Sequence, residues 1–181
     1  GDEVVAFQPV YDSYAAGVAM AGGTLRPVTL RPPDANHSGW WFDAAELEAA
    51  FGPRTRVALL NTPHNPTGKV FTARELEQIA ALVQRWNTVA VVDEVYGHLV
   101  YDGAEHRSLA GIPGMADRTL TVSSGAKTFG LTGWKVGWAF APPRLTAALR
   151  AIHQFVTFTN SAPFQEALAD VLPRAAAEGF Y

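Results

Sequence analysis

The sequence contains no cysteine among its 181 residues and only three lysines. Without cysteine the chain forms neither disulfide bonds nor thiolate metal sites, which is typical of proteins from a reducing compartment. No apolar run approaches the ~20 residues of a membrane-spanning helix, and the first residues show no signal-peptide pattern. We therefore expect a cytoplasmic location and no association with a membrane.

Charge and hydropathy indicate a globular protein that does not bind nucleic acid. The formal net charge of −3 gives no basic footprint of the kind that nucleic acid requires. Hydrophobic residues make up 48% of the chain and charged residues 17%, as in a protein with a buried sheet. The length suits one domain or a large piece of one.

Strand and helix patterns alternate along the chain. Short apolar runs predict strands at residues 4–7, 24–30, 57–60, 89–92, 119–123 and 134–140. Helical patterns lie at residues 13–21, 43–51, 72–86 and 145–155, of which the third begins with a capping box and the second with a similar sequence. This alternation predicts an α/β fold, a mostly parallel sheet with helices on both faces in three αβα layers.

Polar residues follow three of the predicted strands. Asn61 follows the third strand, Asp93 the fourth and Ser123-Ser124 the fifth. In open α/β sheets, ligands bind outside the carboxyl ends of the strands. The sequence therefore predicts a binding site at this edge of the sheet.

The side chains near these strand ends form a set that pyridoxal 5'-phosphate requires. Lys127 supplies an amine that forms a Schiff base with the aldehyde and later moves the α-proton of the substrate. Asp93 offers a carboxylate to the pyridine nitrogen, and Tyr96 a donor to the ring hydroxyl. Ser124 and Lys135 offer hydroxyl and cationic donors to the phosphate.

Each of these residues also has a simpler explanation. A lone lysine is usually a solvated surface charge, Asp93 also suits a turn or a helix N-cap, and Tyr96 suits ordinary packing. Gly125-Ala126-Lys127-Thr128 is not a P-loop, because it lacks the required glycine spacing. The histidines show no metal-binding spacing. We predict that His64 is a turn residue near the site and that His153 lies on a helix surface or at an interface.

The motifs in this order resemble the class I and II aminotransferases of fold type I. The resemblance rests on TPHNPTGKVF at 62–71, DEVYGHLVYDG at 93–103, SSGAKTF at 123–129, TGWKVGW at 132–138 and APFQEAL at 162–168. It runs from about Val4 to Leu172. The nearest branch holds kynurenine, methionine and N-succinyldiaminopimelate aminotransferases.

The resemblance assigns a role to each candidate residue. Lys127 would be the Schiff-base lysine, Asp93 the pyridinium partner and Tyr96 the ring-hydroxyl donor. The remaining roles fall to Asn65 near the ring oxygen and substrate carboxylate, Tyr11 stacked on the pyridine ring, Ser124 and Lys135 at the phosphate, and Phe158 and Thr159 at the partner's site in a homodimer. A cis bond before Pro66 is also frequent in this family.

The members of this family are more than twice as long as this chain. We therefore expect residues 1–181 to be the central part of the cofactor-binding large domain, without the N-terminal segment and the small C-terminal domain. The arginine that binds the substrate carboxylate in the family has no match among the eleven arginines of the chain.

The expected function is transfer of an amino group from an amino acid to a 2-oxo acid. Three alternatives remain open on the sequence: a C–S β-lyase on the same fold, a cofactor-binding sensor domain of a transcription regulator, and an inactive fragment. The motif at 162–168 favours an N-succinyldiaminopimelate type of substrate without fixing it.

Overall fold

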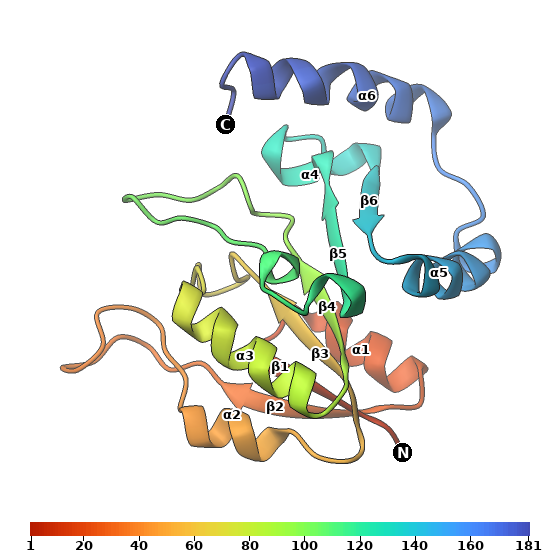
Figure 1. The fold of residues 1–181 in the computed structure, drawn as a ribbon. Helices are drawn as coiled ribbons and strands as arrows, with labels where there is room; N and C mark the ends of the chain where they lie inside the picture. The colour runs from red at the N-terminus through yellow and green to blue at the C-terminus, as the bar shows by residue number, and fades with distance from the viewer.

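A computed structural model describes residues 1–181, which form a six-stranded sheet of order β2-β1-β3-β4-β5-β6. The strands are β1 (Glu3–Gln8), β2 (Thr24–Thr29), β3 (Thr55–Asn61), β4 (Val89–Asp93), β5 (Thr119–Ser124) and β6 (Gly137–Phe140). The first five strands are parallel, and β6 runs antiparallel to β5. The predicted α/β fold with a mostly parallel sheet is thus confirmed (Figure 1).

Six α-helices and three short 3-10 helices accompany the sheet. The α-helices are α1 (Asp12–Met20), α2 (Ala44–Ala50), α3 (Ala73–Arg85), α4 (Gly125–Thr128), α5 (Pro143–Val156) and α6 (Ala162–Ala177). The 3-10 helices are η1 (Leu109–Gly111), η2 (Ala116–Arg118) and η3 (Thr132–Trp134). None of the helices combines the length and the apolar character that crossing a membrane demands.

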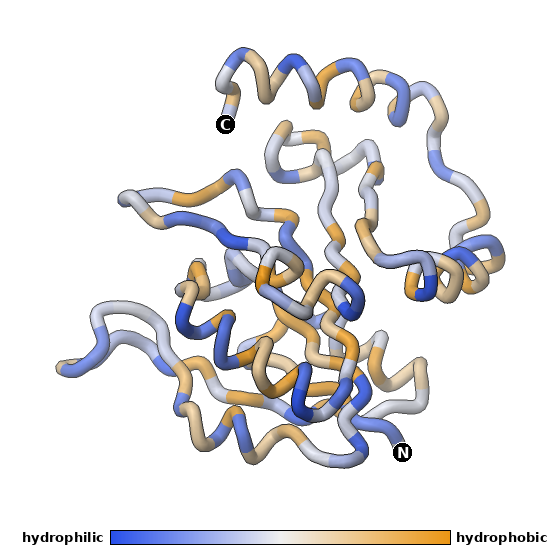
Figure 2. The backbone as a smooth tube through the Cα atoms, viewed as in Figure 1, coloured by the Kyte–Doolittle hydropathy of each residue, from blue (hydrophilic) through white to orange (hydrophobic).

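The main core lies between one face of the sheet and helices α2 and α3. Its fully buried members include Phe7, Leu60, Phe71, Leu76 and Val83. Phe7 and Phe71 meet edge to face with ring centroids 4.9 Å apart, a favourable aromatic geometry. Figure 2 shows apolar segments concentrated where α3 lies on the central strands.

Helix α1 covers part of the opposite face. Its Val18 is buried, while Leu59 and Val91, which point to this face from β3 and β4, are only half-buried. The expected three-layer arrangement is therefore present, with the second layer thinner than the first. The half-covered face matters for function because Asp93 lies on it, two residues beyond Val91.

The two predicted capping sequences behave differently. Thr72 and Glu75 form the complete box, in which each side chain bonds to the backbone of the other. At α2 the Asp43 carboxylate accepts bonds from the N–H groups of Ala45 and Glu46, but the Glu46 side chain does not return the bond. Glu46 instead accepts from the backbone of Thr29, so it links α2 to the end of β2.

Two parts of the C-terminal half differ from the sequence-based expectation. The strand predicted from Trp134 begins only at Gly137, because residues 132–134 form η3 and Lys135 has a φ of 56°. An extended strand cannot pass through a left-handed residue. Helix α6 is not predicted by the sequence pattern at all, since Pro173 lies inside it and no side chain caps its start.

The capping box gives a direct test of local stability. Thr72→Ala removes the hydroxyl that accepts from Glu75 N, and we expect the free energy of unfolding to fall by about 1 kcal/mol. Denaturant unfolding of the intact protein measures this change. Thr72→Ser keeps the hydroxyl and serves as the matched control with near wild-type stability. Equal stability of the alanine and serine variants would contradict the role of the cap.

Candidate functional site

The carboxyl ends of β3, β4 and β5 bring the predicted residues to one edge of the sheet. Asn61 pairs with Asp93 in the register of β3 and β4, and Asp93 pairs with Val122 of β5. Ser124 is the last residue of β5 and precedes α4 directly. The edge predicted from the sequence therefore exists, and three strands supply its polar groups.

The Asp93 carboxylate is held by two donors. Tyr14 Oη donates to Asp93 Oδ2 at 2.7 Å, and the N–H of Val95 donates to Asp93 Oδ1 at 3.0 Å. The backbone oxygen of Asp93 accepts from Asn61 Nδ2 and from the N–H of Thr62, each at 3.0 Å. Bonds to both carboxylate oxygens fix the orientation of the Asp93 side chain.

Tyr14 is a site residue that the sequence analysis missed. Burial first, and then the hydrogen bond to the Asp93 carboxylate, raise the pKa of Tyr14 above its usual range, so the phenol keeps its proton and remains a donor. Tyr11 and Tyr14 lie edge to face with ring centroids 5.6 Å apart. Two tyrosines three residues apart at the start of a helix share one face, which is the signal that would have found Tyr14.

Lys127, which follows β5, lies next to the ring of Tyr96, which follows Asp93 at the end of β4. Lys127 Nζ lies 5.8 Å from the centroid of the Tyr96 ring, within reach of a cation–π contact. Lys127 belongs to the one-turn helix α4, whose start is capped by the Ser124 hydroxyl accepting from Ala126 N at 3.2 Å. The Lys127 side chain is exposed, so its amine is accessible to a ligand.

Asn65 lies on a turn that is held in place by hydrogen bonds from its backbone N–H groups. Its N–H donates to Asn61 Oδ1 at 2.7 Å, which links this turn to the residue that binds the backbone of Asp93. The turn is closed by the N–H of His64, which donates to Lys69 O at 2.8 Å. The bond before Pro66 is cis, as the resemblance implied.

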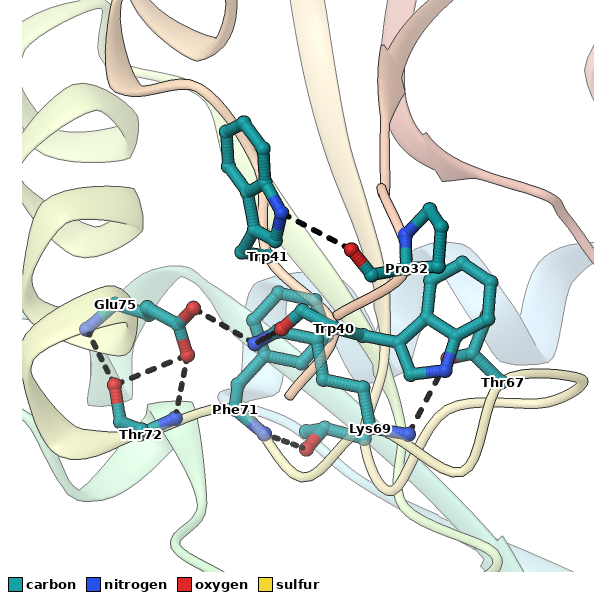
Figure 3. A network of polar contacts seen from close by, with 9 residues as sticks. Pro32, Trp40, Trp41, Thr67, Lys69, Phe71, Thr72 and Glu75 are labelled. Carbon is teal, nitrogen blue, oxygen red and sulfur yellow. Dashed lines mark hydrogen bonds and ion pairs between the residues drawn. The ribbon is translucent and has the colours of Figure 1, made fainter. Parts of the chain in front are cut away.

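A buried lysine anchors the far end of this turn (Figure 3). Lys69 Nζ donates to Glu75 Oε1 at 2.7 Å and to the backbone oxygen of Trp40 at 2.6 Å. Only 6% of the Lys69 side chain is exposed, so the pairing compensates a charge that would otherwise be costly to bury. Because Glu75 also completes the Thr72 capping box, the start of α3 and the turn with Asn65 are tied together.

The chain segments that carry Ser124 and Lys135 lie side by side. The N–H of Gly125, which follows Ser124, donates to the oxygen of Val136, which follows Lys135, at 3.2 Å. The Ser124 hydroxyl accepts one bond, so its own proton is free to donate to a ligand. Lys135 is exposed, and its backbone oxygen accepts from Asn160 Nδ2 at 2.5 Å.

Phe158 and Thr159 lie apart from the Asp93 network, in the segment between α5 and α6. Phe158 is 80% exposed and has a φ of 65°. The Thr159 hydroxyl donates to the backbone oxygen of Asn160, whose side chain contacts Lys135. The segment is thus connected to the Lys135 side of the site and projects an apolar ring into solvent.

A cavity of about 930 Å³ lies beside the site, not within it. Its walls come from residues 36–41, 68–70 and 99–104, together with Thr72 and Glu75. None of the predicted site residues lines it, although Gly68 of the Asn65 turn does. The predicted catalytic residues therefore lie at the strand ends and not in the wall of this cavity.

These groups suit pyridoxal phosphate. Asp93 is a fixed carboxylate for a protonated ring nitrogen, and Lys127 is an accessible amine for an aldehyde. Tyr11 is 47% exposed and offers a ring face for stacking, while Ser124 and Lys135 offer donors for a phosphate. No group of three or more His, Asp or Glu side chains is arranged to hold a metal ion.

His64 lies inside the turn and not on its surface. It is 4% exposed, and its Nδ1 is 2.8 Å from the Thr67 hydroxyl. Burial is the largest cause that lowers the pKa of His64 to about 4, and the charge of Lys69 lowers it further. His64 is therefore neutral at physiological pH. His153 is exposed on α5, as predicted.

Comparison with known proteins shows the family to which the chain belongs. The chain matches the model of the family "Aminotransferase class I and II" over residues 1–178. The probable N-succinyldiaminopimelate aminotransferase DapC of Mycobacterium tuberculosis is 49% identical over 169 residues, which are 93% of this chain and 42% of that relative. Kynurenine–oxoglutarate transaminase 1 of Rattus norvegicus is 46% identical over 180 residues, which cover 96% of this chain and 43% of the relative.

A solved structure shows the same architecture. The structure of N-succinyldiaminopimelate aminotransferase from Mycobacterium tuberculosis superposes with a TM-score of 0.93 at 48% identity. The match covers 98% of this chain and 45% of that structure. The chain therefore spans less than half the length of the relatives that it matches.

The hydrogen bond from Tyr14 is open to a stability test. Tyr14→Phe removes the donor from the Asp93 carboxylate, and we expect the free energy of unfolding to fall by roughly 1.5–3 kcal/mol because the acceptor is charged. Denaturant unfolding of the cofactor-free protein measures this. Tyr11→Phe, at an exposed tyrosine, is the control and should change stability little. A Tyr14→Phe variant as stable as the control would refute the proposed support of Asp93.

The lowered pKa of His64 predicts a pH dependence of stability. Between pH 6.5 and about 4 the unfolded chain binds a proton at this position that the folded chain does not, so stability falls as the pH falls through this window. The slope attributable to His64 is at most about 1.4 kcal/mol per pH unit. In His64→Asn the loss between pH 7 and pH 4.5 should be smaller than in wild type. Identical slopes in the two proteins would contradict the assignment.

Proposed function

The chain belongs to the class I and II aminotransferases, and from this premise we propose that its protein transfers an amino group from an amino acid to a 2-oxo acid, with pyridoxal phosphate as cofactor. The strongest support is the arrangement at the sheet edge. A carboxylate fixed by two donors and an accessible lysine amine beside a tyrosine ring lie on neighbouring strand ends. This combination is what proton transfer next to an electron-withdrawing ring requires.

Asp93 and Tyr14 act together in this proposal. Bound pyridoxal phosphate supplies a reactive aldehyde and a ring that withdraws electrons when its nitrogen is protonated. The Asp93 carboxylate, held in place by Tyr14 and the N–H of Val95, would hold a proton at that nitrogen. Because the donors are fixed before the cofactor binds, no reorganisation is needed during the reaction.

Lys127 has two roles. Its amine would hold the cofactor through the aldehyde, and the same amine, when free, would move the proton of the substrate α-carbon. The one-turn helix α4, capped by Ser124, limits the positions that Lys127 can take. Tyr96 donates to the oxygen on the cofactor ring and Asn65 binds the same oxygen.

The remaining predicted residues bind and orient. Tyr11 stacks on the ring, and Ser124 and Lys135 hold the phosphate through a hydroxyl and a charge. Phe158 and Thr159 belong to a face that contacts a second copy of the chain. That face is apolar and exposed, with Ile152 at 64%, Phe155 at 84% and Val156 at 77% exposure. Exposed apolar surface of this kind marks an interface.

We also propose the domain assignment and the substrate. Residues 1–181 are the central part of the large domain, and the arginine for the substrate carboxylate lies elsewhere in the protein. N-succinyldiaminopimelate is the first substrate to test, since relatives named for it reach 49% identity in sequence and a TM-score of 0.93 in structure. Kynurenine is the second, because transaminases named for it reach 46% identity. The proposed location is the cytoplasm.

Lys127→Ala tests the proposal. The variant should lose the visible absorption band that depends on covalent attachment of the cofactor, and transamination should fall by several orders of magnitude because the amine is both attachment point and base. The intact protein is assayed with each amino acid and 2-oxoglutarate. Arg85→Ala, at an exposed ion pair with Glu48, is the control with wild-type activity.

Retained transamination in Lys127→Ala would refute the role of the lysine. Wild-type release of pyruvate and ammonia from a cysteine-type substrate, without need for an oxo acid, would replace the transferase by the lyase alternative. Cofactor binding without turnover of any amino acid would favour the sensor alternative.

A further inference from the structure

A buried carboxylate–imidazole pair lies next to the turn that carries Tyr96. Glu94 follows Asp93 directly, and Glu94 Oε2 lies 3.3 Å from His106 Nε2. The Glu94 side chain is 13% exposed and the His106 side chain 14%. His106 comes from the far end of the loop that starts after Tyr96 and protrudes from the body of the fold (Figure 1). The pair therefore joins the two ends of this loop.

The backbone of Glu94 is fixed on both sides. Its N–H donates to the oxygen of Val122 in β5 at 2.9 Å, and its own oxygen accepts from the N–H of Gly97 at 2.8 Å. The second bond closes a turn over residues 94–97, in which Tyr96 is the third residue. His106 is therefore bound to the same turn that presents Tyr96.

Gly97 shows how closely His106 packs on this turn. A Cβ at Gly97 would lie 3.0 Å from His106 Cδ2 and 3.3 Å from His106 Nε2. A Cβ at this position would press on the imidazole, which would have to shift by a few tenths of an ångström. Glu94, Gly97 and His106 are therefore closely packed.

The pair lies at ion-pair distance without forming a hydrogen bond. Glu94 Oε1 and both ring nitrogens of His106 are buried without a hydrogen bond. Buried polar atoms without a hydrogen bond are costly, so the 3.3 Å approach of the two side chains is the polar contact that each of them retains. The neighbouring titratable group is His98, whose pKa is lowered by burial and then by the charge of His106. His98 thus favours its neutral form.

We propose that Glu94 and His106 are positioning residues of the transamination site, an inference that rests on the proposed function. They hold the 94–97 turn so that Tyr96 keeps its place beside Lys127 Nζ, 5.8 Å from the ring centroid. Neither residue touches the cofactor or the substrate, and both act through Tyr96. A displacement of about 1 Å at such a site costs roughly a hundredfold in rate.

A double-mutant cycle in the intact holoenzyme tests this role. His106→Gln and Glu94→Gln should each lower kcat roughly tenfold to a hundredfold, with a smaller change in KM. Added to Tyr96→Phe, the same changes should lower kcat little further, because the residue through which they act is already impaired. His37→Gln, at the exposed His37–Asp34 pair, is the control with wild-type kcat. Full additivity with Tyr96→Phe would overturn the proposal.

Hydrogen exchange of the cofactor-free protein provides a readout independent of catalysis. In His106→Gln the amides of residues 94–97 should exchange roughly tenfold faster than in wild type, while those of β1 and α3 keep their rates. Unchanged exchange at 94–97 would overturn the proposal even in an active transaminase. If exchange is faster but the wild-type protein has no transaminase activity, the link between His106 and the turn is supported. In that case only the proposed function is refuted.

Discussion

The Asp93 carboxylate is the point on which the site depends. It lies at the end of β4 on the less covered face of the sheet, where hydrogen-bond donors fix its orientation. Tyr14 from α1 and the N–H of Val95 supply these donors, and Asn61 and Thr62 bind the backbone oxygen of the same residue. One residue therefore connects α1, the end of β3 and the turn after β4. Loss of its carboxylate would remove the bonds to α1 and to the turn after β4.

The surrounding turns are held by pairs of largely buried polar side chains. Lys69 and Glu75 join the Asn65 turn to the start of α3, and Glu94 and His106 join the Tyr96 turn to the end of its loop. A buried pair adds little net stability when it replaces apolar packing, but removal of one partner is costly. This asymmetry suits a site whose turns must keep one conformation. The rigidity of the cofactor-binding edge thus depends on residues outside it.

Much of the fold can be predicted from the sequence, because apolar runs such as residues 89–92 and the capping box at Thr72 are local signals. The start of β6 cannot, since the left-handed conformation of Lys135 is set by the packing of the surrounding turn. Helix α6 contains a proline that hides its pattern. In the site, motifs indicate Lys127, Asp93 and Tyr96, whereas Tyr14 and His106 are distant in sequence from their partners. Only the folded chain brings them into contact.

The central claim is that Lys127, and no other lysine, carries the cofactor. The intact protein is incubated with pyridoxal phosphate, reduced with borohydride and digested with trypsin, and the labelled peptide is sequenced by mass spectrometry. The account predicts a single label within residues 119–135, on Lys127, with cleavage after that residue blocked by the modification. A label on Lys69 or Lys135, or no label at all, would contradict it.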